Sequence, residues 1–174
     1  EFNDPIIGHE DADNISFSIS AQDLDSNDVL TVVPIYNTSF FENISIDPIS
    51  ALANTNREVS LSLKNNKFGN TQIIFNINDG YNTNYITVPI NIIGVNDPPV
   101  IFYNQDRVIN EDQSITFDVQ ASDIEGDLLT FETLNSEHLN ITFNENMITV
   151  LPELNYFGQE EVTLYVSDGY STDS

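Results

Sequence analysis

Acidic and amide side chains recur at matching places in the two halves of the chain. The segment "AQDLDSNDVLT" (21–31) corresponds to "ASDIEGDLLT" (121–130), and the triplet "HED" (9–11) corresponds to "NED" (110–112). The phrase Asn-Asp-Pro occurs near the start of the chain and again within "VNDPP" (95–99). Ca²⁺ prefers oxygen ligands of these kinds, in groups of about six to eight with loose geometry. The pattern therefore favours calcium binding, and a merely solvated acidic surface is the alternative.

The charge of the chain excludes several classes of partner. Four Lys and Arg residues stand against 28 Asp and Glu residues, which gives a formal net charge of −24. Nucleic acids and anionic membranes are bound through Lys and Arg, so we expect neither as a partner. No apolar run approaches the ~20 residues that cross a bilayer, and direct membrane insertion is not expected. The absence of cysteine excludes disulfides and thiol catalysis.

An internal repeat of roughly ninety residues organises the chain. The segment "KFGNTQIIFNINDGYNT" (67–83) aligns without a gap with "YFGQEEVTLYVSDGYST" (156–172). The length of 174 residues suits two small domains, each able to bury a core. We therefore predict a first domain over residues 1–94 and a second over residues 95–174. The chain opens directly into repeat sequence without a secretory signal, so we expect it to be part of a longer protein.

Short segments of alternating apolar and polar residues predict strands throughout both repeats. Clear examples are "ISFSISA" (15–21) and "ITFDVQA" (115–121). The same alternation occurs over residues 59–63, 73–77, 86–92, 139–143 and 162–166. Asp-Gly and Phe-Gly pairs mark turns between such segments, and only "ISALANTN" (49–56) leaves a helical turn open. Seven short strands in each repeat predict an all-β fold, a sandwich of two antiparallel sheets.

The motifs "VNDPP", "NED", "ASDIEGDLLTF" and "NYFGQEEVTLYVSDGYST", in this order and spacing, resemble the cadherin-like tandem repeats of large bacterial or archaeal surface proteins. The resemblance covers essentially the whole chain. It implies two seven-stranded Greek-key sandwiches of the cadherin and immunoglobulin type, an extracellular or cell-surface location, and calcium between successive domains. It implies no single biochemical activity. Cadherins usually carry a further acidic residue before the connector, where this chain has Gly94, so we expect fewer ions than a full cluster of three.

The topology of a Greek-key sandwich predicts where the acidic loops meet. The second-to-third and sixth-to-seventh loops of each domain lie at the end where the chain enters. Candidate calcium ligands at the junction of the two domains are Glu10, Asp11, Asn96, Asp97, Asp123, Glu125, Asp127 and Asp168. Matching ligands of weaker affinity at the entry end of the first domain are Asn3, Asp4, Asp23, Asp25, Asp28 and Asp79. Ordinary turn formers and solvated loop acids are the alternative for each of them.

Other site chemistries fit the sequence poorly. The segment "DLDSND" (23–28) begins like an EF-hand loop, but it lacks the sixth-position glycine and flanking helices. Zinc has only His9 and His138 as histidine ligands, and they lie in different repeats. No nucleophile elbow lies near either histidine, so we predict no enzymatic activity.

The sequence therefore predicts a calcium-rigidified spacer or adhesion repeat of a larger surface or secreted protein. Its partners would be neighbouring repeats, with identical subunits or surface glycans as further partners. A filament subunit completed by a donated strand and a carbohydrate-binding module of an extracellular glycoside hydrolase are the alternatives. The strand that follows "DGYNT" in the first repeat has no counterpart after "DGYST" in the second. The sixth strand there, predicted over residues 161–167, would lack a partner through truncation or, alternatively, through strand donation.

Overall fold

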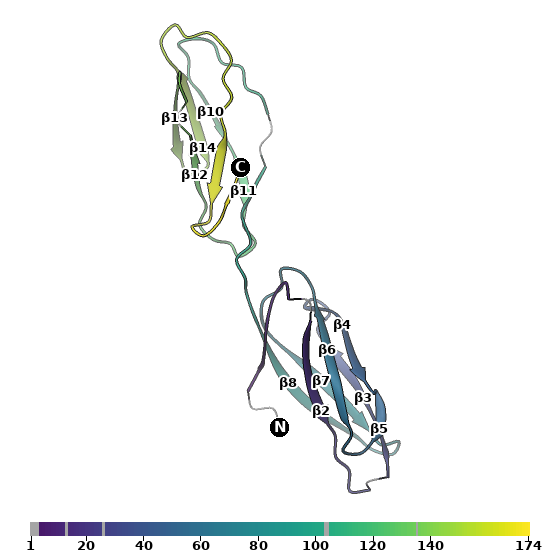
Figure 1. The fold of residues 1–174 in the computed structure, drawn as a ribbon. Coiled ribbons are helices and arrows are strands. Elements are labelled where there is room, and N and C mark those ends of the chain that lie inside the picture. Colours follow the sequence, from purple (N-terminus) through teal and green to yellow (C-terminus); the bar gives the residue numbers. More distant parts are fainter. Residues whose placement is uncertain (1–3, 13, 26, 103–104, 135) are drawn as a thin grey trace. The chain divides into compact units, whose positions relative to one another are not determined.

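The chain forms strands, turns and connecting segments (Figure 1). The computed structural model describes residues 4–12, 14–25, 27–102, 105–134 and 136–174, and none of these lies in a helix. The described part of the chain accordingly has no helix long and apolar enough to span a bilayer. The chain divides into two compact units, Glu1–Val95 (unit 1) and Asn96–Ser174 (unit 2). The prediction of an all-β fold is confirmed.

Unit 1 is built from two sheets, and the chain passes back and forth between them. Its described strands are β1 (Ile6–His9), β2 (Ile15–Ser20), β3 (Val29–Tyr36), β4 (Phe41–Asp47), β5 (Ser50–Leu52), β6 (Asn56–Leu63), β7 (Gly69–Asn78) and β8 (Thr83–Ile93). One sheet has the order β1-β8-β7-β3-β5 and the other has the order β2-β6-β4. β1 runs parallel to β8, and the other pairs are antiparallel.

The core of unit 1 lies between these two sheets. Successive side chains of a strand point to opposite faces, so alternating apolar residues give each sheet one apolar face. The first sheet supplies Val32, Ile73 and Val88, and the second supplies Ile44 and Leu61 to the same buried cluster. Each of these side chains is less than one tenth exposed. This packing of two apolar faces is the sandwich that the alternation predicts.

The described strands of unit 2 are mostly shorter than those of unit 1 and form three sheets. They are β9 (Val100–Phe102), β10 (Ile115–Asp118), β11 (Gln120–Ser122), β12 (Thr130–Thr133), β13 (Leu139–Asn144), β14 (Met147–Pro152), β15 (Leu164–Ser167) and β16 (Thr172–Asp173). The sheets have the orders β10-β14-β13, β12-β15-β16 and β11-β9. Val119, Ile148 and Val150 are buried at the centre, and partly buried residues such as Phe131 pack around them.

Three strand predictions differ from the structure. The strand predicted over residues 115–121 is divided at Val119 into β10 and β11, which belong to different sheets. Residues 49–56 contain no helical turn, because Ser50–Leu52 form β5 and pair with the beginning of β3. The sixth strand of the second repeat begins at Leu164 and not at residue 161. The equivalent part of β7 in unit 1 is held as a strand by pairing with β8, and residues 161–163 have no such pairing.

Candidate metal sites

Three acidic segments of unit 2 meet at one end of its sheets. Thr130 pairs with Ser167, so the loop before β12 and the turn after β15 lie at the same end. Val100 pairs with Ser122, so the residues before β9 lie beside the start of that loop. The connector, the loop after β11 and the turn after β15 therefore converge, as the predicted topology requires.

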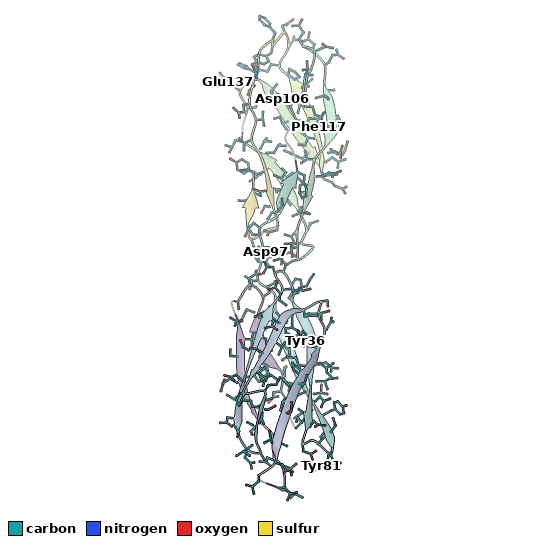
Figure 2. All side chains as sticks on the ribbon, turned by 90° about the vertical axis from the view of Figure 1, so that its right-hand side faces the viewer. Tyr36, Tyr81, Asp97, Asp106, Phe117 and Glu137 are labelled. Atoms are coloured by element: carbon teal, nitrogen blue, oxygen red, sulfur yellow. The ribbon has the colours of Figure 1, made fainter. Side chains whose placement is uncertain are left out.

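Hydrogen bonds link these segments through the predicted ligands. The side-chain amide of Asn96 donates to Asp168 Oδ2 at 2.9 Å. The backbone N–H of Asp97 donates to Glu125 Oε2 at 3.2 Å. Within the loop, the backbone N–H of Asp127 donates to Asp123 Oδ1 at 2.9 Å. Figure 2 labels Asp97 on the connector. All six residues predicted for this end of unit 2 therefore lie in one hydrogen-bonded neighbourhood or beside it.

Three carboxylate oxygens at this end are buried without a hydrogen-bond donor. They are Asp97 Oδ2, Asp123 Oδ2 and Glu125 Oε1. The ion pairs found among the described residues all involve His138, so no Lys or Arg neutralises these carboxylates through one of them. Burying a charged oxygen without a partner is costly, and a bound cation removes that cost. These hard oxygen donors suit Ca²⁺ in their chemistry.

Asp168 is held ionised by its own turn. Its side chain is 7% exposed, and its Oδ1 accepts the backbone N–H groups of Tyr170 and Ser171 at 2.6 Å each. The hydrogen bond from Ser171 is the largest cause that lowers the pKa of Asp168, and the amide of Asn96 adds to it. Asp168 therefore both stabilises the turn and presents a negative Oδ2 to the end of unit 2.

Unit 1 has a second acidic group, which we call the aspartate cluster: Asp23, Asp25 and Asp28. One carboxylate oxygen from each lies within 4.8 Å of the others. Among the described residues, these three form the one group of three or more His, Asp or Glu ligand atoms this close together. No three carboxylates among the described residues of unit 2 lie this close together.

The turn between β7 and β8 lies at the same end of unit 1 as the aspartate cluster, because Thr31 pairs with Asn78. Figure 2 labels Tyr81 in this turn. Asp79 Oδ1 accepts the backbone N–H groups of Tyr81 and Asn82. These bonds, that from Asn82 first, lower the pKa of Asp79, as their counterparts lower that of Asp168. The turn therefore adds a fourth carboxylate to this end.

Sequence reasoning missed Arg57, a buried side chain that binds the backbone of β3 and β5. Its guanidinium is fully buried, and Nη2 donates to the carbonyls of Leu30 and Ala51 at 2.9 and 3.1 Å. Nη1 donates to the carbonyl of Thr55 at 2.9 Å. A signal was present in the sequence, because Arg57 occupies an inward position of β6, in alternation with buried Val59 and Leu61. A basic residue there needs buried acceptors.

Asp4 does not reach the aspartate cluster. β1 pairs with the far half of β8, so that Ile6 lies opposite Ile90, seven residues along the strand from Thr83. At about 3.3 Å per residue, this places Ile6 roughly 23 Å from the start of β8. Asp4 lies only two residues before Ile6, so it cannot span that distance. Asn3, which was predicted with it, lies outside the described residues.

Glu10 and Asp11 lie at the opposite end of unit 1, after β1. Glu10 is 1% exposed, and its Oε1 accepts the backbone N–H of Val95 at 2.8 Å. Asp11 Oδ1 accepts the backbone N–H of Asn66 at 3.5 Å. Both carboxylates therefore accept backbone hydrogen bonds within unit 1. Their role as calcium ligands stays a prediction.

Comparison with known proteins supports an Ig-like class for unit 2. Residues 96–174 match the family model described as Bacterial Ig domain. This match covers less than half of the chain, and unit 2 is similar to that family. No curated protein sequence matches the chain.

Solved structures with a similar fold include human protocadherin-24 EC1-2, at 16% identity and a TM-score of 0.49, over 92% of this chain and 80% of that one. Domains 5-6 of the S-layer protein SbsC match at 15% identity and a TM-score of 0.36, over 98% and 90% of the two chains. An endo-fucoidan hydrolase of glycoside hydrolase family 107 matches 98% of this chain at 16% identity and a TM-score of 0.44. The present chain spans 27% of that hydrolase's length.

Proposed function

We propose that the chain is a pair of calcium-binding, Ig-like repeats of the cadherin-like kind, from a larger extracellular protein of bacterial or archaeal origin. The observation that carries this proposal is the set of buried oxygens on Asp97, Asp123 and Glu125 that have no hydrogen-bond donor. The match of residues 96–174 to Bacterial Ig domain supports the class of protein and an extracellular setting. The repeats would serve as spacers and not as an enzyme.

The residues that would hold calcium in unit 2 come from three segments. Asp97 belongs to the connector, Asp123 and Glu125 to the loop after β11, and Asp168 to the turn after β15. The carbonyl oxygen of the Asn96 side chain and the exposed carboxylate of Asp127 complete the set of oxygen donors. A bound cation would neutralise the buried carboxylates and tie the connector to the loops of unit 2.

The mechanical consequence is a stiffer connector. Pro98 and Pro99 already restrict two backbone angles directly after Asp97. An ion that holds Asp97 against the loops would remove further freedom and so restrict motion between successive repeats. The aspartate cluster and Asp79 would bind a further ion at the entry end of unit 1, more weakly, with water as a ligand.

Thermal unfolding in calcium and in chelator tests the proposal. A ligand at one hundred times its dissociation constant stabilises the folded state by ~2.7 kcal/mol. Glu125→Gln and Asp123→Asn should each remove most of the calcium-dependent increase for unit 2. Glu132→Gln and Asp118→Asn are matched controls, because both residues are exposed on strands. Coincident unfolding curves of the unaltered chain in calcium and in chelator would contradict the proposal.

A further inference from the structure

The five-stranded sheet of unit 1 has an outer face without charged side chains. None of the residues that form β1, β8, β7, β3 and β5 is Asp, Glu, Lys or Arg, although charged residues make up 18% of the chain. The strands of the other sheet of unit 1 include the charged residues Glu42, Asp47, Arg57 and Glu58. Protein surfaces ordinarily carry charges of both signs. An uncharged face on so acidic a chain therefore suits a partner that is itself uncharged.

Apolar side chains are exposed in neighbouring rows of this outer face. Val33 and Ile35 of β3 alternate with inward-pointing residues and are 44% and 50% exposed. Ile35 lies opposite Ile74 of β7. Val33 lies opposite Asn76, which lies opposite the exposed Tyr85 of β8. Contiguous apolar surface of this kind is typical of a binding surface.

A shallow hollow of about 540 Å³ lies at the edge of this face, where β3 leaves β7. β3 pairs with β7 only as far as Tyr36, which lies opposite Ile73 and is labelled in Figure 2. β7 continues beside β8 as far as Gly69. The hollow is lined by residues 35–37 on one side and by residues 70–72 and 74 on the other. It therefore forms from the different lengths of two neighbouring strands.

Three exposed amide side chains lie around the hollow: Asn37, Asn70 and Gln72. Asn70 and Gln72 make no side-chain hydrogen bond to another described residue. Asn37 Oδ1 accepts the backbone N–H and the hydroxyl of Ser39, and its two amide N–H donors have no described acceptor. An amide both donates and accepts hydrogen bonds, as a hydroxyl does. The hollow therefore offers an apolar floor, Ile35 and Ile74, beside groups that can pair with hydroxyls.

We propose that this hollow binds a neutral polysaccharide, with a sugar ring over Ile35 and Ile74 and its hydroxyls hydrogen-bonded to the amides. A sugar ring has apolar C–H faces and hydroxyls around its edge, so it matches an apolar floor bordered by a few polar groups. A polysaccharide with carboxylate or sulfate groups does not fit, because a chain of formal net charge −24 repels it. A second copy of the chain is repelled for the same reason.

The proposal is independent of calcium. The hollow lies at the end of β3, whereas the aspartate cluster precedes the start of that strand. The eight residues of β3 separate the two by roughly 25 Å.

Native electrophoresis of the full chain in gels with and without polysaccharide tests the proposal. The neutral probes are mixed-linkage β-glucan, galactomannan and dextran, and the anionic probe is alginate. At least one neutral probe should retard the chain, in chelator as well as in calcium, and alginate should not. The double variant Ile35→Thr with Gln72→Ala should raise the dissociation constant by about tenfold or more. The control Ser16→Ala with Ser45→Thr, at exposed positions of the other sheet, should leave it unchanged.

Backbone amide signals in NMR spectra of the unaltered chain locate the site without any substitution. The bound polysaccharide should shift the signals of residues 35–37 and 70–74 and leave those of β2, β6 and β4 in place. Retardation by none of the neutral probes, equal binding by the double variant, or shifts confined to other residues would overturn the proposal. Shifts of the same residues with rising protein concentration alone would also overturn it, because a second copy would then cover the hollow. Calcium is not required for the expected result, so this test and that of the proposed function fail independently.

Discussion

Replacement of the buried Arg57 by methionine should destabilise unit 1 without affecting unit 2. Methionine fills much of the same space but has no donor for the carbonyls of Leu30, Ala51 and Thr55. A buried carbonyl left without its donor costs about 1 kcal/mol, so the three together predict a loss of about 3 kcal/mol. For a domain of this size, a loss of that magnitude lowers the melting temperature by roughly 12–24 °C.

The assay is thermal and urea unfolding of the full chain in chelator, followed by circular dichroism and by resolved signals of each unit in NMR spectra. Lys67→Met is the matched control, because Lys67 is exposed, and it should change stability by no more than about 0.5 kcal/mol. Destabilisation of unit 1 by Arg57→Met no larger than that of Lys67→Met would refute the assignment of Arg57 as the support for β3 and β5.

Three further predictions follow from burial and charge. The pKa of Asp168 lies below its ordinary value of 3.8, so its contribution to stability is complete above that value and is lost as the pH falls through the lowered pKa. Asp168→Asn should therefore weaken the acid dependence of the urea midpoint of unit 2, and an unchanged dependence would count against the turn geometry. Phe75→Ala should cost about 3–5 kcal/mol because Phe75 is fully buried, whereas Phe157→Ala, at 86% exposure, should cost less than about 0.5 kcal/mol in the same urea titration. In chelator, sodium chloride should raise the melting temperature, because it screens repulsion within a chain of formal net charge −24; a melting temperature independent of salt would show that this repulsion is small.

Much of the fold could be predicted from local alternation. The alternation over residues 15–21 and 86–92 is strict. The structure has strands at Ile15–Ser20 and over residues 86–92, and their apolar side chains enter the core of unit 1. β5 was not predicted, because its three residues form a strand only through pairing with the edge of β3. β15 was predicted, but its start was placed three residues too early, because the alternation of residues 161–163 is not matched by a neighbouring strand in the structure.

The candidate site of unit 2 could be predicted because strand order alone places its loops. Asp123 and Asp168 follow strands whose ends meet at one edge, and Asp97 precedes the strand that pairs beside them. Asp4 could not be placed in this way. Fewer residues separate Asp4 from Glu10 than separate Asp97 from Glu111. The register of β1 against β8 therefore places Asp4 along the middle of the sheet and not at its entry end.

Counting calcium ions on the protein tests the central claim most directly. The full chain, freed of metal with chelator, is dialysed against millimolar calcium at physiological salt, and the bound metal is measured by atomic emission. The account predicts saturable binding by the unaltered chain, a lower count in the variant Asp123→Asn with Glu125→Gln, and an unchanged count in the variant Asp118→Asn with Glu132→Gln. No calcium bound above the buffer concentration, or an equal count in all three proteins, would contradict it.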